Sequence, residues 1–172
     1  MANKTIQSIL SRVSCREYSE KKVSLGKVNQ ILEAGKYAPS AMNRQIANIT
    51  CVRTKAKVEK LRELSKETSN RDCMYGANTV VLVHAPREDK FTVQDCSCVL
   101  ENIFVAANAL KVQSCWINQF DELLSTPKGM KMKARLGIPE ENRIVGAAIL
   151  GYAKDPSKLV VKERKADFIS IK

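Results

Sequence analysis

The spacing of apolar residues along the chain predicts several amphipathic helices. The apolar face of the first helix would consist of Ile6, Ile9, Leu10 and Val13. A second helix is expected to begin after Ser24, a favoured N-cap residue, and to end at Pro39. Thr54 can cap a third helix, and Pro127 can open another that ends near Gly137.

Four segments have the composition and length of strands. They are residues 47–53, 79–85, 112–118 and 144–152. Alternation of apolar and polar residues predicts a further short strand at residues 168–171. Because helices and strands do not alternate strictly, this order favours an α+β fold over a doubly wound parallel sheet.

Residues 94–110 predict a long helix that is apolar on nearly all sides. A helix of this kind must be buried all round. In a short chain, an interface between two subunits is a plausible way to bury it.

Length and composition predict one globular domain that spans residues 1–172. The chain has 172 residues, and 44% of them are hydrophobic. Its apolar runs are too short to cross a membrane, and its first residues lack the apolar core of a secretion signal. We therefore expect a cytoplasmic protein without a membrane partner.

The chain is strongly basic, with 29 Lys and Arg residues against 18 Asp and Glu residues and a formal net charge of +11. This charge favours anionic partners, such as nucleic acid, an acidic membrane surface or a phosphorylated cofactor. Aromatic residues make up only 5% of the chain, so stacking platforms for single strands are scarce and nucleic acid is an unlikely partner. No G-x-G-x-x-G or Walker motif is present.

The six cysteines form no C-x-x-C pair, which argues against a metal or iron–sulfur site. We interpret them as small buried hydrophobic residues kept reduced in the cytosol. The single histidine, His84, lies within an apolar run and is expected to be a structural residue of the core or of a strand end.

Three polar clusters are candidates for binding chemistry. The guanidinium groups and hydroxyl of residues 12–16 can surround a phosphate, or they can simply neutralise the end of a helix. The small and amide residues at 38–45 can bind the edge of a heterocycle, or they can form a plain connection. The basic residues at 162–165, taken alone, are typical of a solvated surface.

Taken in order, these clusters resemble motifs of the nitroreductase family of flavoproteins, over nearly the full chain. Arg12-Val13-Ser14-Cys15-Arg16 is similar to the family's Arg-x-Ser-x-Arg phosphate loop, and residues 38–45 are similar to its Ala-Pro-Ser-x-x-Asn-x-Gln motif. The long helix with Asp95 resembles the central helix of the family. The remaining matches are Ser114-Cys115-Trp116-Ile117, Leu150-Gly151-Tyr152 and Lys162-Glu163-Arg164.

The resemblance implies a nitroreductase-like sandwich, with a mainly antiparallel sheet flanked by helices, in an intertwined homodimer with FMN at the subunit interface. The residues that would hold the phosphate and ring from one subunit are Arg12, Val13, Ser14, Arg16, Lys162 and Arg164. Pro39, Ser40 and Asn43 would come from the partner subunit, and Trp116 and Ile117 would lie beside the isoalloxazine.

The resemblance also implies an enzyme in which hydride passes from NADH or NADPH through the flavin to a small-molecule electron acceptor, by a ping-pong mechanism and without a catalytic side chain. The acceptor would be a nitroaromatic, a quinone or a similar compound. Reduction of free flavin or of an enone, a redox sensor, and a basic nucleic-acid-binding protein are the alternatives. One departure concerns the substrate pocket, because Ile46-Ala47 follows Gln45 where the family usually has Pro-Trp.

Overall fold

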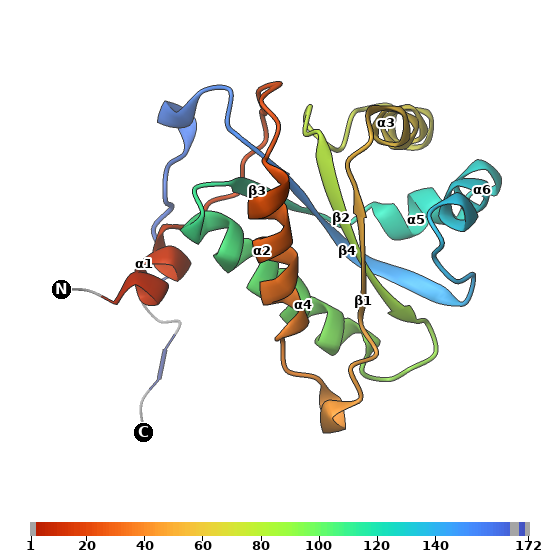
Figure 1. Cartoon of the computed structure of the whole chain (residues 1–172), viewed down its shortest axis with the longest axis horizontal. Coiled ribbons are helices and arrows are strands. Elements are labelled where there is room, and N and C mark those ends of the chain that lie inside the picture. Colours follow the sequence, from red (N-terminus) through yellow and green to blue (C-terminus); the bar gives the residue numbers. More distant parts are fainter. Residues whose placement is uncertain (1–2, 166–168, 171–172) are drawn as a thin grey trace.

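A four-stranded antiparallel sheet forms the middle layer of the structure (Figure 1). The computed structural model describes residues 3–165 and 169–170. The strands, in spatial order, are β1 (Asn48–Val52), β2 (Thr79–Pro86), β4 (Asn142–Gly151) and β3 (Gln113–Ile117). In this sheet, β1 and β3 are therefore the outer strands.

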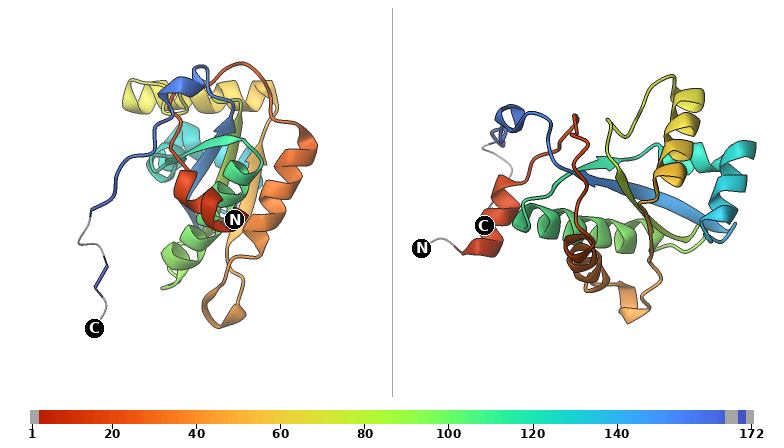
Figure 2. Two further views of the ribbon diagram at one scale, coloured as in Figure 1. Left: turned by 90° about the vertical axis from the view of Figure 1, so that its left-hand side faces the viewer. Right: turned by 45° about the horizontal axis from the view of Figure 1, so that its top comes forward.

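Helices cover both faces of the sheet (Figures 1 and 2). Their bounds are α1 (Lys4–Ser11), α2 (Leu25–Lys36), α3 (Lys55–Ser69), α4 (Thr92–Ala109), α5 (Phe120–Ser125) and α6 (Pro127–Arg135), with short 3-10 turns η1 (Ala41–Asn43) and η2 (Pro156–Lys158). Helices α2 and α4 lie on one face, and α3, α5 and α6 lie on the other. The predicted α+β sandwich with an antiparallel sheet is confirmed.

The core consists of two apolar layers, one on each face of the sheet. Side chains of β2 alternate between them: Val81 and Val83 pack in the layer with α2 and α4, whereas Val80 and Leu82 pack in the other. All residues of β2 before Pro86 are buried, as its continuous apolar composition predicts.

Helices α2 and α4 approach each other closely because a glycine faces the contact. A Cβ atom at Gly35 would lie only 3.0 Å from Ile103 Cγ1. Beside it, the Asn102 side chain of α4 donates a hydrogen bond of 3.0 Å to the carbonyl of Ala34. This pair of helices positions the segment that follows α2, which belongs to the candidate site.

Several helix ends follow the local sequence. Ser24 Oγ accepts a hydrogen bond from Lys27 N, and Thr126 Oγ1 accepts one from Gly129 N. Gly137, just after α6, has the positive φ of 71° that favours glycine. Thr54 occupies the N-cap position of α3, but its side chain makes no capping hydrogen bond.

Some details of the sequence-based prediction differ from the structure or lie outside its described residues. Helix α5 has only six residues and had no periodic signal. Helix α4 leaves Val93 and Ala109 exposed in the single chain, so the expectation that a second subunit buries it stays a prediction. Val13 lies beyond the end of α1. Of the strand predicted at residues 168–171, only residues 169–170 lie within the described part of the chain, and they form no strand.

The apolar face of α1 points away from the body of the chain. Its side chains Ile6, Ile9 and Leu10 are 54%, 51% and 68% exposed. The opposite side of the helix is anchored to α4, where Ser8 Oγ donates to the carbonyl of Val105 at 2.9 Å. No helix in the described part of the chain is both long and apolar enough to cross a bilayer.

Candidate functional site

The segment that follows α1 and residues 160–164, which follow β4 and η2, meet in a basic pocket of about 220 Å³, here called the cradle. It is lined by Arg12, Val13, Ser14, Arg16, Val160, Lys162 and Arg164. Four of these side chains are cationic and none is acidic. Among the described residues, the four cationic groups make no ion pair with a carboxylate. The cradle therefore carries uncompensated positive charge.

Backbone pairing fixes the shape of the cradle. After α1 ends at Ser11, the chain becomes extended, and Ser14 bridges Ser114 of β3 in parallel orientation. The backbone N–H of Cys15 donates to the carbonyl of Ser114 at 2.9 Å. Two residues that both carry hydroxyl groups are thus held side by side, next to the cationic side chains.

Tyr18 supports the cradle from below. Its hydroxyl donates to the carbonyl of Ile149 at 3.4 Å, and its ring lies over Gly151, where a Cβ atom would come within 2.6 Å of Tyr18 Cδ1. Burial raises the pKa of the Tyr18 hydroxyl well above its ordinary value, so this group stays a neutral donor. This role of Tyr18 could not be predicted from the sequence, because Tyr18 lies outside the matched motif.

The chain that returns to the cradle after β4 is tied to residues 17–19. Ser19 N donates to the carbonyl of Tyr152 at 2.8 Å, and Lys154 N donates to that of Glu17 at 3.0 Å. The Glu17 carboxylate also accepts a hydrogen bond from Lys158, which lowers its pKa, and pairs with Lys154. These contacts direct the following segment so that Lys162 and Arg164 reach the cradle.

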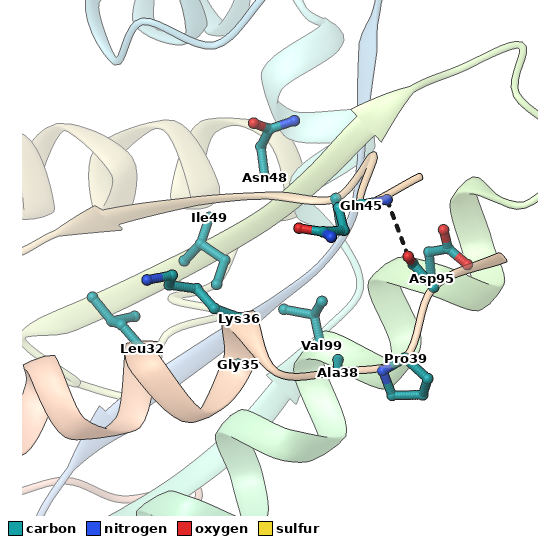
Figure 3. Close-up of a pocket in the computed structure, with 12 residues that line it drawn as sticks. Leu32, Gly35, Lys36, Ala38, Pro39, Gln45, Asn48, Ile49, Asp95 and Val99 are labelled. Atoms are coloured by element: carbon teal, nitrogen blue, oxygen red, sulfur yellow. Dashed lines mark hydrogen bonds between the residues drawn. The ribbon is translucent and has the colours of Figure 1, made fainter. Parts of the chain in front are cut away.

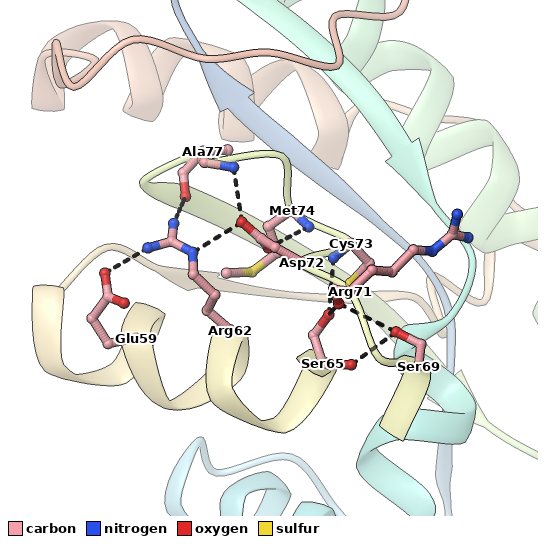
Figure 4. Close-up of polar contacts among 10 residues, drawn as sticks. Glu59, Arg62, Ser65, Ser69, Arg71, Asp72, Cys73, Met74 and Ala77 are labelled. Atoms are coloured by element: carbon pink, nitrogen blue, oxygen red, sulfur yellow. Dashed lines mark hydrogen bonds and ion pairs between the residues drawn. The ribbon is translucent and has the colours of Figure 1, made fainter. Parts of the chain in front are cut away.

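The segment from Ala38 to Gln45, here called the amide loop, is held in a strained conformation. Met42, Asn43 and Gln45 have positive φ angles of 54°, 54° and 51°. Non-glycine residues rarely adopt such angles, and they occur often at binding sites. Gln45 N donates to Ser40 Oγ at 3.0 Å (Figure 3), and Gln45 Nε2 donates to Asn43 Oδ1 at 3.0 Å.

Asp95, in the first turn of α4, anchors the amide loop. One of its carboxylate oxygens accepts a hydrogen bond of 3.0 Å from Ala41 N, and the side chain lies at the edge of a pocket of about 440 Å³ behind the loop (Figure 3). The motif match placed Asp95 in the central helix without a role. A buried acid in an otherwise apolar helix was the available signal.

Within one chain, the cradle and the amide loop lie at opposite ends of α4. The loop is attached at Asp95, whereas α1, which leads into the cradle, is attached at Val105 and Asn108. Ten to thirteen residues of helix separate these attachments, which is about 15–20 Å. The structure thus brings Arg12, Val13, Ser14, Arg16, Lys162 and Arg164 together, but leaves Pro39, Ser40 and Asn43 apart from them.

Trp116 and Ile117 face opposite sides of β3. The Trp116 side chain is 36% exposed, lies over Gly146 and is tilted by 39° against Phe104 at 6.0 Å between ring centroids. Ile117 is 3% exposed and belongs to the core beneath the other face. Neighbouring residues of a strand alternate in direction, so of these two only Trp116 has an exposed side chain, and Ile117 could meet a ligand only through its backbone.

His84 is a buried structural residue, as its position in an apolar run predicted. Its two ring nitrogens form hydrogen bonds with Thr50 Oγ1 at 3.0 Å and with Asn142 Nδ2 at 2.9 Å. Burial, with a smaller contribution from Lys133, lowers the pKa of His84 to about 4. The described residues contain no cluster of His, Cys, Asp and Glu that could hold a metal ion.

Comparison with known proteins identifies the family. The model of the nitroreductase family matches residues 9–70 and 63–152. A protein of Archaeoglobus fulgidus, provisionally named NADH dehydrogenase/NAD(P)H nitroreductase, is 34% identical over 158 residues, which are 87% of this chain and 86% of that protein.

Solved structures show the same relationship. A nitroreductase with bound FMN from Bacteroides fragilis has a TM-score of 0.91 and 33% sequence identity, with 99% of both chains covered. A nitroreductase with bound FMN from Desulfitobacterium hafniense has a TM-score of 0.87 and 24% identity, again with 99% of both chains covered. The chain belongs to the nitroreductase family.

Proposed function

We propose that this protein is an FMN-dependent oxidoreductase that uses NADH or NADPH to reduce a nitroaromatic, a quinone or a similar acceptor. The main support for this proposal is the cradle. Four cationic side chains and a serine hydroxyl line it, and its described lining residues include no carboxylate. The donor set fits a phosphate monoester, which accepts charge-assisted hydrogen bonds from guanidinium and ammonium groups. The FMN bound to the Bacteroides fragilis relative supports the same assignment.

The residues of the chain would bind and orient the cofactor. Arg12, Ser14 and Arg16 would hold its phosphate from one side, and Lys162 and Arg164 would hold it from the other. FMN held there would supply the two-electron redox chemistry that links the nicotinamide donor to the acceptor. A ping-pong order follows if the oxidised donor leaves before the acceptor enters.

We propose further that the working protein is a homodimer in which the amide loop of each subunit completes the cofactor site of the other. Two observations support this arrangement. The apolar face of α1 is exposed in the single chain, and such a face is typical of an interface. The cradle and the amide loop of one chain are separated by much of α4.

We also propose that residues 1–172 form one FMN-binding domain and that the protein works in the cytoplasm. The six cysteines support the location, since all of them are free thiols in the structure. A reducing compartment keeps thiols in this state.

Spectroscopy of the purified protein tests the cofactor. The protein is expected to be yellow, and denaturation should release one FMN per subunit. Titration of the apoprotein with FMN and with riboflavin, which lacks the phosphate, tests the cradle itself: FMN should bind at least tenfold more tightly, since the phosphate adds hydrogen bonds between charged groups. A colourless protein that binds neither flavin would contradict the proposed function.

A further inference from the structure

A second polar pocket, here called the arginine pocket, lies at the far end of β3 from the cradle. It has a volume of about 640 Å³ and is formed where β2 and β3 end and where β4 and α5 begin. Its charged residues are Arg87, Asp121, Glu122 and Arg143. This volume is in the range of small-molecule sites.

Asp121 holds the two arginines of this pocket in place. Its carboxylate accepts a hydrogen bond from Ile144 N at 2.9 Å and two from the Arg87 guanidinium at 3.2 and 3.0 Å. The nearest guanidinium nitrogen of Arg143 lies 3.8 Å from the same carboxylate. The Asp121 carboxylate therefore faces two guanidinium groups, and its three hydrogen bonds come from Arg87 and the backbone rather than from Arg143.

Arg143 retains unused hydrogen-bonding capacity. Among the described residues its guanidinium makes only the 3.8 Å ion pair, and its Nε is buried without a partner. The side chain is still partly exposed, so its terminal nitrogens are accessible from the pocket. A guanidinium group with free N–H donors binds a carboxylate or phosphate oxygen pair in a fork geometry.

The position of the pocket relates it to the cofactor, and this step rests on the proposed function. Along β3, Ser114 lies at the cradle, Trp116 presents its ring to solvent, and Asn118 lines the arginine pocket. At about 3.3 Å per residue, Ser114 and Asn118 are about 13 Å apart. A flavin with its phosphate in the cradle and its ring beside Trp116 would therefore end next to the arginine pocket.

We propose that the arginine pocket binds an anionic group of the second substrate beside the flavin ring, with Arg143 making the contact, while Arg87 holds the Asp121 carboxylate in its ion pair. The anionic group is either a carboxylate on an aromatic acceptor or a phosphate of the nicotinamide donor. The protein thus selects substrates whose charged group and reacting group are both within reach of this end of β3.

A matched pair of acceptors tests the proposal. 4-Nitrobenzoate and 4-nitrobenzamide have nearly the same shape but differ in charge. We define the ratio as kcat/KM for 4-nitrobenzoate divided by kcat/KM for 4-nitrobenzamide. Arg143→Gln removes the guanidinium and its charge, and should lower this ratio about tenfold. Arg143→Lys keeps the charge and the ion pair with Asp121, and should show an intermediate change. Arg135→Gln, which makes the same substitution on the exposed surface of α6, is the control and should leave the ratio unchanged.

Other outcomes show whether the anion belongs to the acceptor or to the nicotinamide donor, and whether a failure concerns the arginine pocket or the proposed function. A rise of about tenfold in the KM for NADH or NADPH, with the acceptor ratio unchanged, assigns the pocket to the donor phosphate. If neither quantity changes in either Arg143 variant while the variants keep their FMN and their thermal midpoint, the proposal is wrong. A wild-type protein that binds no FMN would instead overturn the proposed function.

Discussion

A site shared between two chains makes a quantitative prediction for mixed dimers. Arg12→Ala removes a guanidinium from the cradle, and Asn43→Ala removes an amide from the loop. In a two-fold dimer, each homodimeric variant lacks one element in both sites, so both should be impaired. A mixed dimer carries both defects in one site and an intact second site.

The expected recovery follows from counting sites. Random reassociation of equal amounts makes about half of the dimers mixed, and half of the sites in those dimers are intact, so activity should return to about a quarter of the wild-type value. The assay is the acceptor-dependent oxidation of NADH or NADPH after unfolding and co-refolding of differently tagged subunits. Affinity purification on both tags verifies exchange.

The attachment of the two elements to α4 is the physical reason for this expectation. Their attachment points are about 15–20 Å apart in one chain, so a single chain does not bring Asn43 to its own cradle. Asn43 has a φ of 54°, which alanine disfavours, so Asn43→Gly is the control for backbone strain. Absence of recovery with either loop variant, despite proven exchange, would refute the shared site.

Three further predictions concern the cradle and the core. Arg164→Ala should weaken FMN binding about tenfold or more without affecting riboflavin, whereas Lys165→Ala, which does not line the cradle, should change neither titration. The pKa of His84 is about 4 in the folded protein against an ordinary value of 6.5, so the unfolded chain binds a proton first as the pH falls. The free energy of unfolding should therefore drop by up to about 3 kcal/mol between pH 6.5 and 4. If the thermal midpoint of His84→Gln falls by the same amount over this range, His84 is not the cause. Gly151→Ala should lower the thermal midpoint because its Cβ meets a tyrosine ring at 2.6 Å, whereas Gly26→Ala, with no atom within 4 Å, should leave it unchanged or raise it.

The sequence predicted those structural features that depend on only a few neighbouring residues. Ser24 and Thr126 cap their helices, and β2 is buried along its length, as composition and spacing predicted. Helix α5 was missed because six residues hold too little periodicity for a prediction. The exposed face of α1 could be predicted as apolar, but the sequence does not show what covers it, and in the single chain Ile6, Ile9 and Leu10 stay exposed.

For the candidate binding residues, sequence-based prediction has a different limit. Motif matching predicts which segment lies near a ligand, but it does not predict which side chain of a strand faces it. Trp116 and Ile117 were assigned together, and the alternation of the strand separates them. Arg87 and Arg143 belong to no motif, because they come from two strand ends that only the folded sheet brings together.

Backbone hydrogen bonds, more than ion pairs, hold the chain segment that leads to the cradle after β4. Glu17 forms ion pairs with Lys154 and Lys158, but all three side chains are exposed, and exposed ion pairs contribute little to stability. The backbone hydrogen bonds that join residues 17–19 to residues 152–154 hold the returning chain whether or not these pairs form. Among the described residues, the cationic groups of the cradle have no carboxylate partner to give up when an anion binds, and their mutual repulsion favours the bound state. Ligand binding should accordingly stabilise the fold, and added phosphate alone should raise the thermal midpoint of the apoprotein, by less in Arg164→Ala than in the wild type at the same phosphate concentration.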